Sequence, residues 1–208
     1  MCYTIIRDRK GGIIFMVKRE MYMKRIRPFI GTDLIKVMTG IRRSGKSVML
    51  ELIKQELIDS GVSSSQFISI NFEDMRYTHL QTAKALYDEI SSRSAGIDGK
   101  IYLFFDEIQE VKDWEKCINS FRVALDCDIY ITGSNAKLLS GELATYLAGR
   151  YVEFIVYPFS FAEFLELYHS VFPEETVQTC ALPICSEKLS AIYFVRRNAI
   201  SGQHSLCG

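Results

Sequence analysis

The 208-residue sequence has no long apolar run and no excess of charge of either sign. A membrane-spanning helix needs about 18 consecutive apolar residues, and the run from Ile13 to Val17 is far shorter. No small-residue cleavage site follows that run, so it does not fit a signal peptide either. Lys plus Arg number 25 and Asp plus Glu number 25, so the whole-chain charge predicts neither a polyanionic nor a membrane partner.

The sequence also lacks any C-x-x-C pair among its six cysteines. Cys117 and Cys127 are the only two in the central region, and we expect them to be small core residues. Unpaired cysteines of this kind are typical of a reduced compartment, so we expect a cytoplasmic protein.

Basic residues do gather locally near the N-terminus. Five of them fall within ten positions: Lys18, Arg19, Lys24, Arg25 and Arg27. A solvated helix face is the simpler interpretation, because runs of charge usually lie on the surface. Contact with nucleic acid is the alternative, and a steep salt dependence of DNA affinity would support it.

Both ends of the sequence suggest non-native segments. Back-translation of Lys10–Met16 resembles a bacterial ribosome-binding sequence before a start codon, so we expect translation to begin at Met16 and residues 1–15 to be leader. Residues 177–184 resemble the translation of a sequencing adapter, so we expect the native frame to end near Glu175. The predicted organisation is therefore a leader (1–15), one domain (16–170) and a truncated tail (171–208).

Between these ends, strand and helix patterns alternate. We expect strands at 35–39, 67–72, 101–105, 129–132 and 151–157 and helices at 46–60, 81–92, 113–126 and 135–147. A further helix should follow Ser160, with Glu163 completing a capping box. Strands that alternate with helices predict an α/β fold of three layers, with a parallel sheet flanked by helices.

A phosphate-loop motif follows the first expected strand. Residues Gly40 to Ser47 match G-x-x-x-x-G-K-[ST] at every fixed position, between a strand and a helix as the mechanism requires. Backbone N–H groups of such a loop converge on phosphate oxygens at a helix N-terminus. Lys46 is placed to reach the β- and γ-phosphates, and the Ser47 hydroxyl to bind Mg²⁺. We expect nucleotide contact along the whole stretch: Gly40, Ile41, Arg42, Arg43, Ser44, Gly45, Lys46, Ser47 and Val48.

Two carboxylates follow the apolar strand Ile101–Phe105, in the Walker B form. The carboxyl ends of parallel strands line the ligand crevice of an α/β sheet, so Asp106 can face Mg²⁺ opposite Ser47. Glu107 is the candidate base that orients or deprotonates the attacking water.

Four further residues are candidates with alternatives. Another expected strand ends with Thr132, Ser134 and Asn135, of which at least one could sense the γ-phosphate or the attacking water. The alternative is that Ser134 or Asn135 caps the next helix. Arg150 precedes the last strand and could stabilise charge on the transferring phosphoryl group, or pair with a surface acid.

These motifs together resemble one known group. In order, they are Ile41–Ser47, Asn71–Asp74, Phe105–Gln109 with Trp114, Thr132–Asn135, and Gly149–Arg150 with Pro158–Phe161. The group is the bacterial and archaeal AAA-type P-loop ATPases that carry a helical C-terminal domain of unknown function. The resemblance covers roughly Val17 to Glu175. It implies an ATPase core with ATP and Mg²⁺ as ligands, with Lys46, Ser47, Asp106 and Glu107 in the roles above and a sensor at Ser134/Asn135.

The leading hypothesis is a Mg²⁺-dependent ATPase that couples nucleotide state to a C-terminal domain, a protein partner or a second copy of the chain. The alternative is a nucleotide-binding switch or interaction module that hydrolyses little and is associated with nucleic acid. A small-molecule kinase would need a lid and an acceptor pocket, and neither motif is recognisable. The preference for ATP over GTP follows from the resemblance.

Overall fold

The computed structural model describes residues 3–7, 13–133 and 147–171. The chain divides into two compact units, one formed by Met1–Arg19 with Phe159–Gly208 and the other by Glu20–Pro158. The second unit holds the sheet and the phosphate loop.

The Glu20–Pro158 unit is built on a five-stranded sheet in the order β4-β5-β6-β3-β7, and every neighbouring pair is parallel. The strands are β3 (Ile35–Thr39), β4 (Phe67–Asn71), β5 (Ile101–Asp106), β6 (Cys127–Thr132) and β7 (Tyr151–Ile155). All five carboxyl ends therefore lie at one edge of the sheet, and all five amino ends lie at the other.

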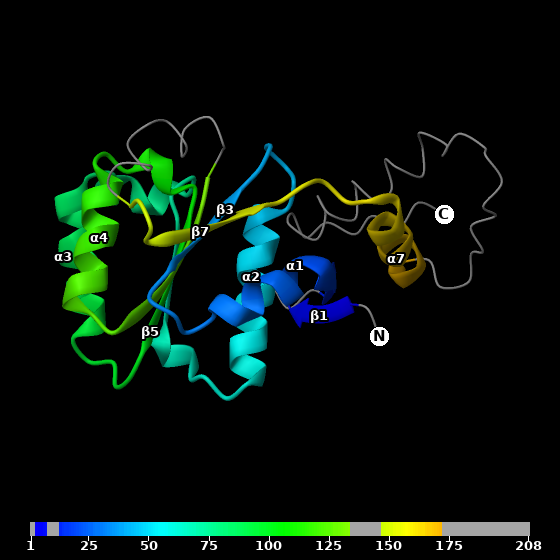
Figure 1. Ribbon diagram of the computed structural model, residues 1–208, viewed down its shortest axis with the longest axis horizontal. Helices are drawn as coiled ribbons and strands as arrows, with labels where there is room; N and C mark the ends of the chain where they lie inside the picture. The colour runs from blue at the N-terminus through cyan, green and yellow to red at the C-terminus, as the bar shows by residue number, and fades with distance from the viewer. Residues whose placement is uncertain (1–2, 8–12, 134–146, 172–208) are drawn as a thin grey trace. The chain divides into compact units, whose positions relative to one another are not determined.

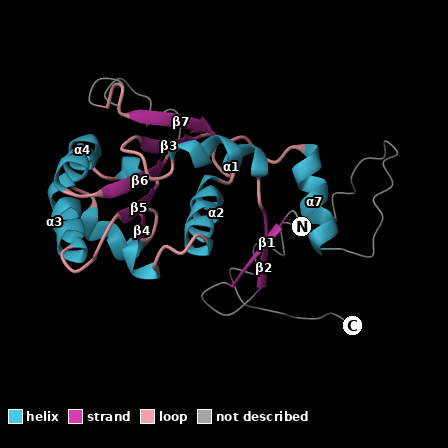
Figure 2. Ribbon diagram, turned by 60° about the horizontal axis from the view of Figure 1, so that its bottom comes forward, coloured by secondary structure: helices cyan, strands magenta, loops and turns pink. Residues whose placement is uncertain are grey.

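Helices cover both faces of this sheet, as Figures 1 and 2 show. The α-helices of the unit are α1 (Glu20–Ile26), α2 (Lys46–Asp59), α3 (Ala83–Ser94) and α4 (Trp114–Ala124). Short 3-10 turns are η1 (Arg27–Phe29), η2 (Ser64–Gln66), η3 (Met75–Leu80) and η4 (Ile108–Glu110). Helices α3 and α4 pack on one face and α2 lies on the other, which gives the expected three-layer α/β fold.

The main core lies between the sheet and α3/α4. Alternate residues of the central strands, such as Ile35 and Val37 on β3, join Leu86 and Phe121 of these helices in one apolar cluster. Strands β3, β5 and β6 are buried along their whole length. Burial on both faces explains why β5 is a continuous apolar run from Ile101 to Phe105, whereas β3 and β6 each bury a charged residue, Lys36 and Asp128.

The other unit contains a hairpin and one helix among its described residues. Strand β1 (Tyr3–Arg7) pairs antiparallel with β2 (Ile13–Val17), and α7 spans Phe161–Val171. The predicted capping box is present, because Ser160 N–H donates to Glu163 Oε2 at 2.8 Å and Glu163 N–H donates to Ser160 Oγ at 3.3 Å. The translation start at Met16 and the native end near Glu175 stay predictions.

The expected elements match the structure to within two residues at each end wherever the chain is described. The helix expected at 81–92 occupies Ala83–Ser94, because Thr82 caps it by accepting a hydrogen bond from Ala85 N–H. Strand β7 ends at Ile155, two residues before the expected end. The helix expected at 135–147 lies almost entirely outside the described residues.

Candidate functional site

The phosphate loop connects the carboxyl end of β3 to the first turn of α2. Gly40 has φ 145° and Gly45 has φ 97°, values that residues with a Cβ rarely adopt. Gly45 is the residue that precedes α2, so the loop ends at the positive end of that helix. An anion bound there would be stabilised by the helix, and phosphate binding by this loop stays a prediction.

Lys46 points back over this loop. Its side chain is buried, and Nζ donates to the carbonyl oxygens of Gly40 and Ile41, each at 3.3 Å. The same nitrogen lies 3.7 Å from Oε1 of Glu107, which directly follows the carboxyl end of β5. The structure thus brings together the ammonium and the candidate base that the sequence separates by 61 residues.

Asp106 is the last residue of β5 and is buried. The Thr132 hydroxyl at the end of β6 donates to its Oδ1, and the Asn71 amide at the end of β4 donates to its Oδ2 at 3.3 Å. Two neighbouring strand ends therefore fix the carboxylate from both sides. Each of these bonds occupies one lone pair, so the carboxylate keeps acceptor capacity for another ligand.

Glu107 follows in a left-handed backbone conformation, with φ 56° and ψ 50°. Its N–H donates to Thr132 Oγ1 at 3.0 Å, and its Oε2 accepts from Gln109 Nε2 at 2.6 Å. A non-glycine residue in this region is uncommon, and the backbone bond to Thr132 helps to hold it there.

The candidate metal ligands are Ser47 and Asp106. They are the sequence neighbours of Lys46 and Glu107, whose side chains lie 3.7 Å apart, so their joint binding of a metal stays a prediction. Among the described residues, no three His, Cys, Asp or Glu side chains cluster as a metal-binding group. One hydroxyl and one carboxylate fit Mg²⁺, which binds through one or two protein oxygens while phosphate and water supply the rest.

The remaining predicted loop residues differ in exposure. Ile41, Arg42 and Arg43 are exposed, Val48 is half-buried, and Ser44 is buried. Arg42 lies 3.7 Å from Glu73 in an exposed ion pair that joins the loop to the segment after β4. Ser134 and Asn135 lie outside the described residues, so their expected sensor role stays a prediction.

Arg150 is not brought to the phosphate loop. Its carbonyl accepts from Ile35 N–H at 2.9 Å, and Ile35 begins β3, whereas the loop follows the last residue of β3. A five-residue strand at about 3.3 Å per residue separates the two edges by roughly 16 Å. The Arg150 side chain donates to Asn119 Oδ1 at 2.8 Å.

The sequence offered Thr132 only as a candidate sensor, and it gave Asn71 and Gln109 no role beyond their place in the family motifs. Asn71 stands opposite Asp106 in the parallel register of β4 and β5, and Thr132 ends the strand on the other side of β5. The available signal for a shared site was that β4, β5 and β6 each end in a polar residue. The sequence does not show that β4 and β6 flank β5, and that order is what brings these residues together.

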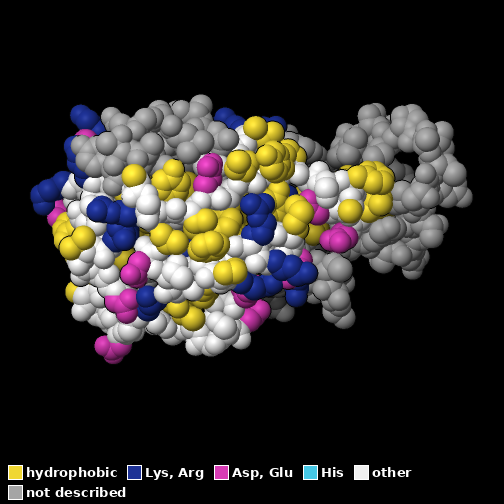
Figure 3. Space-filling model, in the orientation of Figure 1, with side chains coloured by type: hydrophobic (Ala, Val, Ile, Leu, Met, Phe, Trp, Pro, Cys, Tyr) yellow, Lys and Arg dark blue, Asp and Glu magenta, His cyan; other side chains and the backbone are white. Residues whose placement is uncertain are grey.

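The basic stretch near the N-terminus is partly neutralised. Arg19 pairs with Glu163 at 2.9 Å, and Arg27 binds Glu20 and Glu56. Lys18, Lys24 and Arg25 remain exposed. On the face shown in Figure 3, Lys and Arg side chains are interspersed with acidic and apolar ones.

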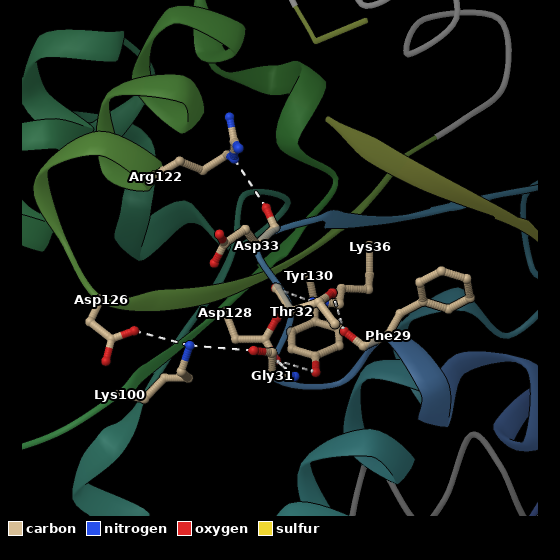
Figure 4. A network of polar contacts seen from close by, with 10 residues as sticks. All are labelled: Phe29, Gly31, Thr32, Asp33, Lys36, Lys100, Arg122, Asp126, Asp128 and Tyr130. Carbon is tan, nitrogen blue, oxygen red and sulfur yellow. Dashed lines mark hydrogen bonds and ion pairs between the residues drawn. The ribbon is translucent and has the colours of Figure 1, made fainter. Parts of the chain in front are cut away.

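A second polar cluster lies near the amino ends of β3 and β6, shown in Figure 4. Lys36 and Asp128 form an ion pair with both side chains fully buried. Asp128 Oδ2 also accepts from Gly31 N–H at 2.7 Å and from the Tyr130 hydroxyl at 2.8 Å, and Lys36 Nζ donates to Thr32 O at 2.9 Å. Burial lowers the pKa of Lys36, and the charge of Asp128 opposes that shift. The cluster anchors the segment that enters β3.

Comparisons with known proteins place the chain in a family. A family model described as AAA domain matches residues 32–165, which is more than half of the chain. An uncharacterised protein of Haemophilus influenzae is 47% identical over 150 residues, covering 72% of this chain and 38% of that protein. An uncharacterised protein of Methanocaldococcus jannaschii is 38% identical over 152 residues, covering 73% and 31%. The chain therefore spans about a third of the length of these curated relatives.

A solved structure supports the same fold. The AMPPCP-bound DnaA from Aquifex aeolicus superposes with a TM-score of 0.50 at 15% identity, covering 95% of this chain and 61% of that chain. Within the described part of the chain, no helix is long and apolar enough to span a membrane.

Proposed function

The chain belongs to the AAA domain family of P-loop ATPases, and from this membership and the site geometry we propose that it binds ATP with Mg²⁺ and hydrolyses the β–γ phosphoanhydride bond. The observation that carries the proposal is the 3.7 Å approach of Lys46 Nζ to Glu107 Oε1 across the crevice. A loop suited to phosphate, an ammonium and a carboxylate that can act as base meet at that point.

In the proposed mechanism, the loop N–H groups and Lys46 bind the β- and γ-phosphates. Lys46 exchanges its contacts with Glu107 and the loop carbonyls for phosphate oxygens, which releases the carboxylate. Ser47 and Asp106 would hold Mg²⁺, which when bound neutralises charge on the phosphates. Glu107 then orients the attacking water and accepts its proton.

Thr132 links the two acids. Its hydroxyl donates to the Asp106 carboxylate and accepts from the Glu107 N–H, so one side chain holds the carboxylate of Asp106 and the backbone of Glu107. A fixed backbone at Glu107 limits where its carboxylate can lie relative to the attacking water.

Single-turnover release of γ-phosphate tests the proposal. Wild-type chain and Glu107→Gln should bind Mg²⁺–ATP with similar affinity, while the hydrolysis rate of the variant falls by roughly 100-fold or more. Lys46→Ala should lose binding as well. Equal rates in wild type and Glu107→Gln would remove the catalytic proposal and favour a nucleotide-binding switch with little hydrolysis.

Arg150 enters the proposal only through a second copy of the chain. It lies at the opposite edge of its own sheet, so it cannot reach the phosphates bound by its own loop. An arginine that stabilises phosphoryl transfer can be supplied by a partner instead. We therefore propose a homo-oligomer in which Arg150 of one copy faces the phosphate loop of the next.

The longer relatives suggest what the hydrolysis drives. Because this chain spans about a third of their length, the ATPase domain accompanies other segments in those proteins. We propose that nucleotide state is coupled to such an attached domain or to a protein partner. Nucleic-acid association through the exposed Lys18, Lys24 and Arg25 is the less favoured alternative, because Arg19 and Arg27 are already paired with acids.

A further inference from the structure

The Gln109 side chain donates a short hydrogen bond to the carboxylate of the candidate base. Its Nε2 donates to Glu107 Oε2 at 2.6 Å. The other carboxylate oxygen, Oε1, is the one that lies 3.7 Å from Lys46 Nζ. The two oxygens of Glu107 are therefore distinguished: Oε2 is engaged by Gln109, and Oε1 faces the phosphate loop.

The turn that carries Gln109 is rigid. In η4, Glu110 N–H donates to Glu107 O at 3.2 Å and Val111 N–H donates to Ile108 O at 3.0 Å. Ile108 and Val111 are buried in the core. Lys112 continues the anchor through backbone bonds with Gln81 and Ala83, each at 3.0 Å. The carboxamide of Gln109 is thus presented to Glu107 from a fixed backbone.

The other end of the Gln109 carboxamide finds no such contact. Its Oε1 is buried and has no hydrogen-bond partner within the described part of the protein. A buried acceptor without a partner costs stability, so this side chain is not placed here to strengthen the fold. The bond to the Glu107 carboxylate is what fixes its orientation, since the reversed amide would set two acceptor oxygens against each other.

We propose that Gln109 is a positioning residue for hydrolysis, which holds Glu107 so that Oε1 alone is presented to the attacking water. This inference rests on the proposed function, because it assigns Gln109 to the same reaction. Three groups act in succession: the water, the carboxylate that takes its proton, and the amide that orients the carboxylate. A base oriented by a third group is a recurrent design in enzymes.

The test replaces Gln109 with methionine, which keeps the length of the side chain but removes the donor and the unpaired oxygen. Gln109→Met should lower kcat for ATP hydrolysis by roughly 10- to 100-fold. KM for ATP should stay within about threefold, because Gln109 does not touch the phosphate loop. The melting temperature should be unchanged or higher, whereas a purely structural role predicts that it falls.

Two comparisons complete the experiment on the full chain. Gln81→Met makes the same exchange at an exposed glutamine and should leave kcat unchanged. In the Glu107→Gln background, adding Gln109→Met should change the residual rate by less than about threefold, because an orienting residue has no effect once its base is gone.

The outcomes separate the two proposals. Hydrolysis that depends on Glu107 but is unaffected by Gln109→Met overturns the role of Gln109 alone. A fall in kcat that persists undiminished in the Glu107→Gln background also overturns it. Wild-type chain that releases no phosphate, or releases it equally well with Glu107→Gln, overturns the proposed function and the inference together.

Discussion

A Cβ on Gly40 would lie 2.2 Å from the carbonyl oxygen of Val156, a distance that no folded protein tolerates without movement of the backbone. The contact exists because Val156 N–H donates to Thr39 O at 2.7 Å, which draws the end of β7 against the start of the phosphate loop. Gly40 is therefore required by packing as well as by its φ of 145°.

Gly40→Ala should separate the loop from β7 and weaken both stability and nucleotide binding. We expect a loss of about 2–4 kcal/mol in the free energy of unfolding, as for strained or overpacked positions, together with loss of ATP binding. Urea titration and calorimetry measure the two. Gly61→Ala is the matched control, because Gly61 has φ 98° and nothing within 4 Å of the added Cβ. It should cost only about 1–2 kcal/mol and leave ATP binding intact. Equal effects at both positions would contradict the packing argument.

Arg150 predicts complementation between inactive copies. Arg150→Ala and Glu107→Gln should each lower hydrolysis, Arg150→Ala by roughly 1000-fold if the arginine completes a neighbour's site. Mixing the two variants should restore part of the activity. A Glu107→Gln copy still has Arg150 and can offer it to the site of an Arg150→Ala neighbour, which still has Glu107. Phosphate release against the mixing ratio measures this.

Arg122→Ala is the control for Arg150. Arg122 shares Asn119 Oδ1 with Arg150, at 3.4 Å and 2.8 Å respectively, so it lies at the same edge of the sheet. Its loss should leave hydrolysis unchanged. Full activity of Arg150→Ala alone would remove Arg150 from the reaction.

The buried pair of Lys36 and Asp128 predicts a large coupling energy. Asp128→Asn leaves the Lys36 ammonium buried without a counter-charge, and such a change costs about 3–5 kcal/mol. Lys36→Met with Asp128→Asn should cost less than the sum of the two single changes, because both charges are then gone. The exposed pair Lys84–Asp88, with Nζ and Oδ2 2.8 Å apart, is the matched control and should couple by about 0.3–0.5 kcal/mol. Additive losses at Lys36 and Asp128 in urea unfolding would refute the prediction.

The two buried thiols predict that the free energy of unfolding falls at alkaline pH. Burial raises the pKa of both Cys117 and Cys127 from 9.0 to about 12. A group whose pKa is raised by folding contributes stability that is complete below its unfolded pKa and is lost as the pH rises toward its folded pKa. Between pH 9 and 12 each thiol should therefore lower the free energy of unfolding by up to about 1.4 kcal/mol per pH unit.

Cys117→Ala with Cys127→Ala should flatten this alkaline decline, measured by urea unfolding from pH 8 upward. Tyr130, whose pKa burial also raises, is present in both proteins, so its contribution cancels in the difference. An identical slope in wild type and variant would show that the thiols ionise as easily in the folded protein as in the unfolded one.

The order of elements was predictable because local physics dominates it. Residues Ile101 to Phe105 of β5 are apolar, and two acids follow them. Helix α2 begins where the phosphate loop ends. Residue type therefore marks both boundaries. The approach of Lys46 to Glu107 followed from a general rule, that parallel strands bring their carboxyl ends to one edge.

What could not be predicted depends on the strand order. Asn71 and Thr132 contact Asp106 only because β4 and β6 flank β5, an arrangement that no spacing in the sequence reports. Arg150 was a candidate because it precedes a strand near the end of the domain. Its register beside Ile35 places it at the amino edge, and register is a tertiary property. Gln109 reaches Glu107 through a 3-10 turn, which a strand or helix period does not reveal.

The junction of β3 and β6 also limits how genes of this kind can be recombined. Lys36 and Asp128 are 92 residues apart in the chain, so a chimera that keeps Lys36 but takes β6 from a parent without an acid at position 128 would bury a lone charge. The same two strands lead directly into the phosphate loop and into Thr132. Crossovers with such parents should therefore survive only where both strands come from one of them.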